Sequence, residues 1–566
     1  MAFVNVTVIP MDRERVDPGQ TVVIRDGRIA VIGAVGEVPV PNGATVVDGS
    51  GRYLLPGLTD AHAHLDTTGG GTRPDFGDAP LYLAYGVTSI VNLRGIPEHV
   101  VWKRKVESGE LLGPSVYSAG PFVDEPRVST PDEMQQEIPA QASQGYDVIK
   151  FHPIGGGLGA ATTTGLSSRA YEAMIEAARR AKMPLVGHAP ISLGLEAVLQ
   201  TGQPLAHLNE LNVVYFLEAR SLLRFALATG GSLLVLLLVV AAWGVAAVLR
   251  RWHRTATGQS RTVVHVRWLT SWLLLAGLLE IGCYFLLWPG GMLFDSVILR
   301  PVFTGIAILI ATGAIVLAVR TGRIWRDRTI SLLSRLEASL VSVAAVVLAL
   351  VTMSHWVPLA WKSGEAGIEN LANRLAEAGV SVQTTMVVYD TFIGMNGPDA
   401  ARILAEPALD LLSVDLRGRW RAMGANWPIP SMATTFLIPR YVEFLQQLTA
   451  ALYRQGVLLM AGTDTMGVPL ILPGTSLHRE LQLLIEGGLT PYEAIATATV
   501  APAMFLGRDR EFGTVSVGKR ADLLLIDGNP LENIGPLKQP VGVMVRGRWF
   551  PREVLDHMLA VLAQKG

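Results

Sequence analysis

Side chains that can bind a metal ion stand at the ends of several short apolar segments of the chain. His62 and His64 are two residues apart, and because alternate residues of a strand point to the same face, both imidazoles can reach one ion. Four further candidates close other apolar segments: Lys150, His188, His207 and Asp464. Imidazoles and carboxylates are ordinary ligands of divalent metals, so the set indicates a metal site.

Each of these signals alone also has an ordinary structural explanation. A single His188 or His207 is more often a core histidine than a ligand, and Asp464 could cap a turn or a helix. Lys150 follows a buried-strand pattern at 147–149, where an ammonium costs free energy without a partner, although a strand-end lysine that reaches solvent would also fit. The recurrence of such residues at successive segment ends favours a common site.

The segments that end in these residues form a repeating pattern once one long apolar insert is set aside. Short β-branched runs predict strands at 58–64, 86–93, 114–123, 146–152, 183–188, 204–207, 380–389 and 457–464. Apolar residues at helical spacing predict helices between them, for example at 168–181 and 368–378. This alternation favours an α/β fold, a parallel (β/α)8 TIM-like barrel over 56–220 and 363–507, which would hold its chemistry at the carboxyl ends of the strands.

The two ends of the chain have a different character. Residues 1–55 and 508–550 read as strands separated by turns such as Asp527-Gly528-Asn529-Pro530. We therefore expect both termini to pair in a small β-sandwich domain beside the barrel, followed by a C-terminal helix at 551–566.

One region, 221–362, carries most of the apolar excess. Four stretches in it are almost free of charge and long enough to cross about 30 Å of hydrocarbon as helices, at about 225–249, 268–288, 299–319 and 338–360. Trp268, Trp272, Trp288 and Trp356 fit the interfaces of a bilayer. The region predicts an inserted α-helical transmembrane domain and a multi-pass integral membrane protein; a buried helical domain is the alternative.

The charges around these helices bear on which side of the membrane the barrel lies. The loops at 250–267 and 320–335 are rich in Arg, and the positive-inside rule makes them cytoplasmic, with the barrel outside. Residues 1–20, however, contain charges and no apolar core of a signal peptide, which favours a cytoplasmic barrel. The two signals oppose each other, so the side stays open.

The overall composition excludes several classes of protein. The chain has 566 residues, 50% of them hydrophobic, with 47 Lys and Arg against 48 Asp and Glu. A net charge of -1 gives no general attraction to nucleic acid, and the apolar content excludes a disordered chain. Cys283 is the single cysteine, so no intramolecular disulfide can form.

Two parts of the chain resemble the amidohydrolase superfamily. Residues 54–64, LLPGLTDAHAH, are similar to that family's first-strand signature. The tail is similar in three places: 478–481 (HREL), 488–495 (GLTPYEAI) and 513–523. The similarity extends over nearly all residues outside the insert and is greatest to the imidazolonepropionase and Xaa-Pro dipeptidase branch.

The resemblance implies a centre of two divalent metal ions, usually zinc. One ion would be held by His62, His64 and Asp464, and the other by His188 and His207. Lys150, carboxylated by CO2, would bridge the two ions together with a hydroxide, because a carbamate is an anionic oxygen ligand whereas an ammonium would be repelled. The ions would lower the pKa of the bound water, and Asp464 would act as general base and then as general acid.

Two further residues refine this expectation. His152, two residues beyond Lys150, can reach the same cavity and contact substrate, although a packing role fits equally well. Within the family, deaminases carry a Glu a few residues after the fifth-strand histidine. Here no carboxylate follows His188 before Glu196, which disfavours deamination.

The predicted function is that of a membrane-anchored, metal-dependent hydrolase of a C–N bond in an amide, a cyclic amide or a dipeptide-like molecule. Its partners would be a small-molecule amide and the lipid bilayer, with no nucleic acid. Because the insert follows the sixth strand on the catalytic face, amphiphilic amides are the expected substrates; a plain anchor is the alternative. A membrane receptor or sensor with an inactive barrel is a second possibility, but all six ligand residues are present, which favours catalysis.

Overall fold

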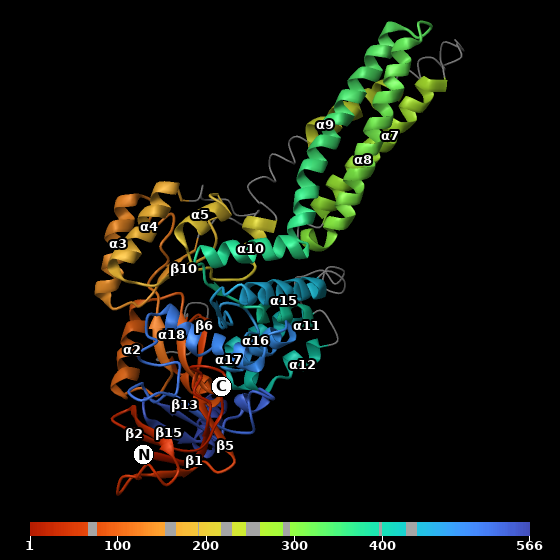
Figure 1. Ribbon diagram of the computed structural model, residues 1–566. Coiled ribbons are helices and arrows are strands. Elements are labelled where there is room, and N and C mark those ends of the chain that lie inside the picture. The colour runs from red at the N-terminus through yellow and green to blue at the C-terminus, as the bar shows by residue number, and fades with distance from the viewer. Residues whose placement is uncertain are drawn as a thin grey trace. The chain divides into compact units, whose positions relative to one another are not determined.

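The computed structural model describes residues 1–565 apart from several internal stretches (Figure 1). The stretches left out are 66–75, 153–165, 191, 217–228, 245–260, 287–294, 396–398 and 426–437. The chain divides into two compact units, one formed by Met1–Leu211 with Glu369–Gly566 and the other by Asn212–Ile368. The predicted insert at 221–362 therefore lies within a unit of its own.

Strands from both ends of the chain form one eight-stranded sheet in the first unit. The strands are β1 (Ala2–Val8), β2 (Asp17–Arg25), β3 (Arg28–Ala34), β4 (Val46–Asp48), β5 (Arg52–Pro56), β13 (Leu523–Asp527), β14 (Gly542–Val545) and β15 (Arg548–Pro551). Their order is β15-β14-β13-β5-β1-β2-β3, with β4 paired to β1. The antiparallel pair β5–β13, in which Leu54 lies opposite Leu525, joins the two ends of the chain. The ladder is continuous, whereas the expected sandwich would have two separate sheets.

Seven short parallel strands make up the rest of the β-structure that the model describes. They are β6 (Leu58–Ala63), β7 (Val87–Asn92), β8 (Ser115–Ser118), β9 (Ile149–Phe151), β10 (Leu185–Gly187), β11 (Val382–Gln383) and β12 (Leu459–Met460). They pair as β6-β7-β8, β9-β10 and β11-β12. Isolated parallel bridges link these groups: Ala119 with Val148, Gly187 with Leu205, Leu205 with Val382, and Ala63 with Thr465. The pairings thus run in a ring that returns to β6.

The predicted strands are all shorter in the structure, and two of them differ in more than length. The predicted strand 204–207 is reduced to the bridges of Leu205. The predicted strand 380–389 ends after β11, and helix α11 (Val387–Met395) begins where the strand was expected to continue. Thr385 has a positive φ of 47°, which turns the chain, and the Val387 N–H donates to the Glu480 carboxylate at 2.7 Å instead of to a neighbouring strand.

Helices pack around these strands. In chain order they are α1 (Ala79–Ala84), α2 (Pro97–Ser108), α3 (Pro131–Gln144), α4 (Ser168–Ala181), α5 (Leu195–Thr201), α10 (Glu365–Glu377), α11, α12 (Ala400–Leu404), α13 (Val414–Ala425), α15 (Ile438–Arg454), α16 (Thr475–Glu486), α17 (Pro491–Thr497), α18 (Val500–Phe505) and α19 (Arg552–Lys565). Short single turns lie at η2 (Asn212–Phe216), η3 (Pro407–Leu411) and η4 (Gly535–Lys538). Helix α4 shows the general pattern, because Tyr171, Met174 and Ile175 are buried on one side while Arg179 and Arg180 are exposed.

The second unit consists of long apolar helices. They are α7 (Arg261–Leu286), α8 (Asp295–Arg326) and α9 (Leu332–Lys362), accompanied by a shorter helix at 229–244. Each of the three contains a stretch that is long and apolar enough to cross a membrane: Arg261–Leu279, Val302–Arg326 and Leu332–Pro358. Large apolar side chains point outward, with Leu309, Ile315 and Leu350 about two-thirds exposed at 69%, 65% and 65%. Where four spans of similar length were expected, the described residues contain three, because only 16 residues of the first are described as helix.

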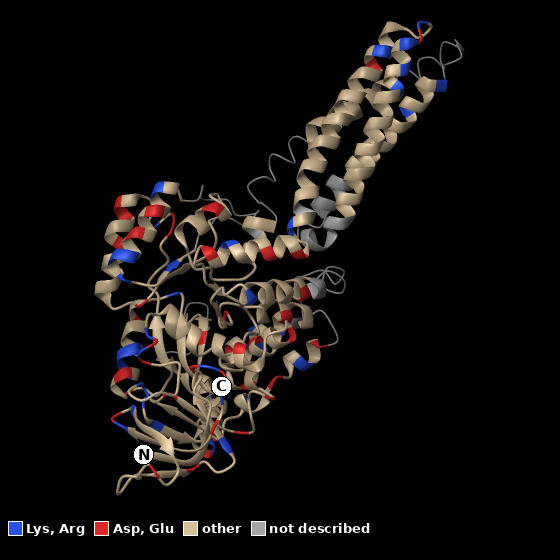
Figure 2. Ribbon diagram, viewed as in Figure 1, with Lys and Arg blue, Asp and Glu red and all other residues tan. Residues whose placement is uncertain are grey.

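Helices α8 and α9 run antiparallel, and Arg residues collect at the end where they join. The Thr321 hydroxyl lies 3.0 Å from that of Ser342, whereas Thr304 near the start of α8 bonds to the Trp356 carbonyl near the end of α9. Five basic residues flank the turn between the helices: Arg320, Arg323, Arg326, Arg328 and Arg335. Figure 2 shows blue segments of ribbon at one end of these helices.

Candidate metal centre

The six predicted ligand residues all line one cavity of about 650 Å³ in the first unit. His62, Lys150 and His188 lie at or just beyond the carboxyl ends of β6, β9 and β10. The remaining walls come from loops and from helix α13. The complete lining is His62, His64, Arg94, Phe122, Lys150, His152, His188, His207, Leu416, Arg419, Trp420, Met423, Asp464, Met466, Gly467 and Pro469.

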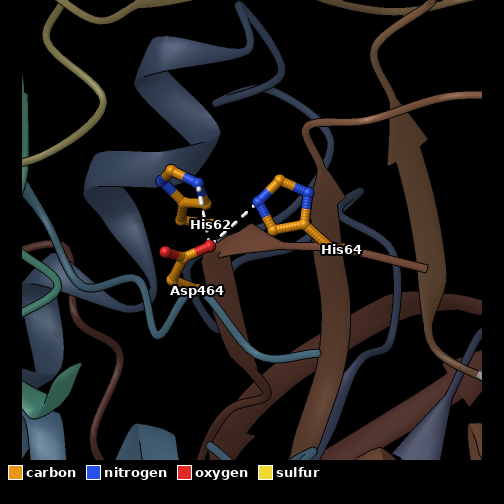
Figure 3. A group of neighbouring side chains, drawn as sticks. All are labelled: His62, His64 and Asp464. Carbon is orange, nitrogen blue, oxygen red and sulfur yellow. Dashed lines mark ion pairs between the residues drawn. The ribbon is translucent and has the colours of Figure 1, made fainter. Parts of the chain in front are cut away.

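Three of these residues form a compact group (Figure 3). Ligand atoms of His62, His64 and Asp464 all lie within 4.8 Å of one another. Asp464 Oδ1 is 2.9 Å from His64 Nε2 and 3.6 Å from His62 Nε2. Asp464 adopts a positive φ of 60°, a conformation that non-glycine residues rarely adopt and that tends to occur at functional sites. This group has the composition and spacing of one metal-ligand set.

The other imidazoles follow in a row beside this group. The ring of His207 lies 4.4 Å from that of His62 between centroids and 4.8 Å from that of His188. His152 lies 4.2 Å from His188 and stacks on Phe122 at 4.8 Å. The predicted second pair, His188 and His207, is therefore brought together, and His152 lies where it can contact a molecule in the cavity.

Each of three histidines is held through its Nδ1 atom by an acceptor behind it. His62 Nδ1 lies 2.9 Å from the Ala206 carbonyl, and His207 Nδ1 lies 2.9 Å from the Thr385 hydroxyl. His188 Nδ1 lies 3.0 Å from the Glu210 carboxylate. When Nδ1 donates its proton to such an acceptor, Nε2 is left with a free lone pair for a metal ion.

Burial keeps these imidazoles in the form that can bind metal. It lowers the pKa of His62, His188 and His207 well below the ordinary histidine value, with a further contribution from neighbouring cationic groups. They are therefore neutral at pH 7, as a metal ligand must be.

The two oppositely charged candidates, Lys150 and Asp464, are also shifted. Burial lowers the pKa of Lys150 to about 7, although the carboxylates of Asp464 and Glu210 oppose this. Burial acts to raise the pKa of Asp464, but the hydrogen bond from His64 and the positive groups nearby lower it to about 2. Near neutral pH, Asp464 is thus an anion and much of Lys150 is a free amine.

The residues present fit a divalent metal ion. Within the described part of the chain, four buried nitrogens of the cavity have no hydrogen-bond partner: His62 Nε2, His64 Nδ1, Lys150 Nζ and His152 Nδ1. A buried polar atom left unpaired costs free energy, and a bound ion would give His62 Nε2 a partner. His188 and His207 lie outside the compact group of His62, His64 and Asp464. The candidate ligands of a first ion are therefore closer together than those of a second ion.

Some residues of the site carry signals that sequence analysis did not use. Glu210 follows His207 by three residues, and a carboxylate so close to a candidate ligand is a signal that could have been noticed. Thr385 and Arg94 carry no such signal, because each reaches the site only through the fold. Glu210 also changes one earlier inference: no carboxylate follows His188 closely in sequence, yet one contacts it in space.

Comparison with known proteins agrees with this geometry. Residues 432–550 match the model of the amidohydrolase family. Similar curated proteins include an adenine deaminase of Paracoccus denitrificans (36% identical over 73 residues), a D-hydantoinase of Geobacillus stearothermophilus (41% over 70) and an imidazolonepropionase of Idiomarina loihiensis (47% over 45). These matches cover 13%, 12% and 8% of this chain and 12%, 14% and 11% of the relatives, so the chain matches only a small part of their length.

Solved structures match over almost the whole chain. Bottromycin amidohydrolase superposes with a TM-score of 0.59 at 19% identity, covering 100% of this chain and 90% of that one. A Xaa-Pro dipeptidase with bound methionine gives a TM-score of 0.53 at 14% identity, covering 97% and 99%. The first unit thus combines the α/β fold of amidohydrolase structures with a group of side chains that could hold a metal ion.

Proposed function

We propose that this protein is a metal-dependent hydrolase that cleaves a C–N bond of a small amide, built on a parallel (β/α)8 barrel and anchored in a membrane by its helical unit. The observation that carries the proposal is that His62, His64, Lys150, His188, His207 and Asp464, which are scattered over some 400 residues of sequence, line one cavity. The amidohydrolase match at 432–550, which includes Asp464, supports the same chemistry.

Two divalent ions would be held by the compact group of His62, His64 and Asp464 and by the pair His188 and His207, with Lys150 between them. Metal ions bound there would polarise the scissile carbonyl and make water nucleophilic at neutral pH. The neutral imidazoles of His62, His188 and His207 and the anionic Asp464 supply ligands in the required charge state.

Lys150 suits the role of a carbamate-forming lysine. Only a free amine attacks CO2, forming an N–C bond and releasing one proton, and the pKa of about 7 leaves much of Lys150 in that form at neutral pH. The carbamate would replace a buried amine without a hydrogen-bond partner by an anionic oxygen ligand.

Asp464 is placed to transfer a proton during hydrolysis. Asp464 lines the cavity, and its Oδ1 accepts a hydrogen bond from His64. As an anion it can accept the proton of the attacking water and then deliver it to the leaving nitrogen, which balances the reaction to an acid and an amine. His152, stacked on Phe122, would contact the substrate.

The test is metal analysis of the purified full-length protein together with a panel of acyl dipeptides, cyclic amides and adenine. We expect bound zinc or a similar ion, and turnover of at least one substrate that stops after chelation and returns with added metal. Adenine is included because several relatives are named adenine deaminases and because Glu210 places a carboxylate beside His188. Ligand binding without turnover would support a receptor, and the absence of bound metal would overturn the proposal.

The helical unit suggests that the substrates are amphiphilic. It interrupts the chain after His207, a cavity residue, so membrane attachment and the cavity are close in sequence. We expect acyl amides with longer chains to be turned over faster than short ones in liposomes. Equal rates for all chain lengths would leave the helical unit as a plain anchor.

A further inference from the structure

Glu210 is a buried carboxylate that lies behind His188, a residue of the cavity wall. Glu210 follows His207 by three residues, and only 7% of its surface is exposed. One carboxylate oxygen lies 3.0 Å from His188 Nδ1, and the other accepts a hydrogen bond from the Ala189 N–H at 2.9 Å. Both carboxylate oxygens therefore contact the two residues that directly follow β10, and one of these is the candidate ligand His188.

This contact differs in kind from those that hold the other histidines. His62 is held by the backbone carbonyl of Ala206 and His207 by the neutral hydroxyl of Thr385, whereas His188 is held by a carboxylate. A hydrogen bond to a charged acceptor is stronger than a neutral one, and it makes the imidazole more electron-rich. The Ala189 contact fixes the carboxylate in turn, so it can hold the ring of His188 in one orientation.

The two halves of the centre also differ in what assembles them. Ligand atoms of His62, His64 and Asp464 lie within 4.8 Å of one another, and Asp464 itself contacts both rings. His188 and His207 lie outside that group, and among the described residues Asp464 forms ion pairs with His62 and His64 but with neither of these two. Their orientation therefore depends on the residues behind them.

We propose that Glu210 is a positioning residue that makes the His188–His207 half of the centre able to hold its metal ion. Without it, the chain would retain an ion at His62, His64 and Asp464 and lose the other. This inference rests on the proposed two-metal centre.

The experiment compares four full-length proteins in detergent: the unchanged chain, Glu210→Gln, Glu210→Ala and Glu480→Gln. The last is a matched control, since Glu480 is another buried carboxylate of this unit that accepts hydrogen bonds from a hydroxyl (Thr384) and a backbone N–H (Val387). Among the described residues it forms no hydrogen bond or ion pair with a histidine. Each protein is stripped of metal and loaded with Co²⁺. Bound cobalt per chain, its visible absorption spectrum and its affinity in competition with a chelator are measured.

We expect two ions per chain in the unchanged protein and in Glu480→Gln, and one in Glu210→Ala. In Glu210→Gln the amide oxygen can still accept from His188 but the Ala189 contact is lost, so the second ion should bind about 10- to 100-fold more weakly. The spectrum that remains in Glu210→Ala should be that of the first ion alone. Loss of a residue that only stabilised the fold would not weaken the binding of one ion while leaving the binding of the other unchanged.

Two ions of unchanged affinity in Glu210→Ala, or the loss of both ions from a chain that still unfolds cooperatively on heating, would overturn the inference while leaving the proposed function intact. If the unchanged protein binds no cobalt, the proposed function itself fails. Should Glu210→Ala not fold, the nearly isosteric Glu210→Gln decides, because an affinity for the second ion equal to that of the unchanged chain would overturn the inference.

Discussion

Asp464 combines two demands that the cavity must satisfy at once. It has to remain an anion while buried, which the hydrogen bond from His64 and the nearby positive groups achieve by lowering its pKa to about 2. It also has to lie against both His62 and His64, which its unusual backbone conformation allows. A side chain of the same shape without the charge should therefore lose function while keeping the fold.

We expect Asp464→Asn to reduce kcat/KM for any hydrolysed amide by a factor of about 10²–10⁴, because asparagine cannot accept and return the proton. The rate is measured at saturating metal, so that weaker metal binding does not account for the loss. Asp410→Asn, on the surface, serves as the control and should leave the rate unchanged. A rate for Asp464→Asn within a factor of two of the control would remove Asp464 from the catalytic step.

Glu480 should make the stability of the protein depend on pH. Burial raises its pKa to about 7, although hydrogen bonds from Thr384 and Val387 act to lower it, whereas in an unfolded chain a glutamate has a pKa of about 4.3. Between about pH 4.3 and 7 Glu480 binds more proton in the folded state than in the unfolded state, so its contribution to the free energy of unfolding falls as the pH rises through this window. Asp60, raised in the same way to about 7, adds to the trend.

Replacing Glu480 by glutamine should therefore reduce this fall. The expected difference is on the order of 1–3 kcal/mol between pH 5 and pH 8, seen as a smaller change of the thermal midpoint than in the unchanged protein. Identical pH dependence in both proteins would show that Glu480 titrates normally.

That His62, His64, Lys150, His188, His207 and Asp464 share one cavity could be predicted from sequence, because they stand at predicted strand ends and because the surrounding motifs resemble a known family. The residues behind them could not. Thr385 contacts His207 across 178 positions and is part of an uncharged run that looks like a strand, so no local pattern marks it. Glu210 was within reach of local reasoning, but its partner His188 lies 22 residues earlier in the chain.

Asp464 belongs to the segment that follows β12, and this segment packs against β6, which carries His62. The packing of the two elements therefore sets the position of Asp464 relative to His62. Gly462 lies against β6, where an added Cβ would come within 2.5 Å of the His62 Cβ and 2.9 Å of its backbone nitrogen. A side chain at this position would therefore separate the two halves of the compact metal-ligand group.

We expect Gly462→Ala to destabilise the protein by about 1–3 kcal/mol and to weaken metal binding at the same time. Gly418→Ala is the matched control, because Gly418 lies within α13 and an added Cβ there meets nothing within 4 Å. The control should stabilise the protein by about 0.5–1 kcal/mol, as alanine favours helix more than glycine does. Thermal unfolding and chelator competition measure both effects; an effect of Gly462→Ala no larger than that of the control would show that β6 and this segment can move apart.

The element boundaries show where sequence patterns stop being informative. The run Thr384-Thr385-Met386-Val387-Val388 is rich in β-branched residues and predicts strand, yet α11 begins at Val387. The deciding partner is the Glu480 carboxylate, which lies 93 positions away and receives the Val387 N–H. Long apolar helices, in contrast, are specified by their own composition, and α8 and α9 were predicted within a few residues at their centres.

At the scale of the whole molecule, the helical unit exposes many large apolar side chains, which are unfavourable in contact with water. Leu309, Ile315 and Leu350 are about two-thirds exposed along α8 and α9. Burying such side chains in hydrocarbon is worth about 1.5–3 kcal/mol each, so the helices gain far more from lipid than from water.

We therefore expect the full-length protein to sediment with membranes and to resist extraction by alkaline carbonate. A chain in which residues 217–364 are replaced by a flexible Gly/Ser linker should stay in the supernatant and still bind metal, because all residues of the cavity lie outside that range. Recovery of the full-length protein as a soluble monomer without detergent would contradict membrane anchoring.

The ring of parallel pairings has a consequence for how the protein is made. Leu205 pairs with Val382, and Ala63 with Thr465, so residues translated before the helical unit find their neighbours only after that unit has been synthesised. At about 5–20 residues per second, a ribosome will hold the unfinished half with open strand edges for roughly 10–30 s. Bilayer insertion of the nascent helices and shielding of those edges must then proceed together, and the yield of active enzyme should depend on chaperone supply during translation.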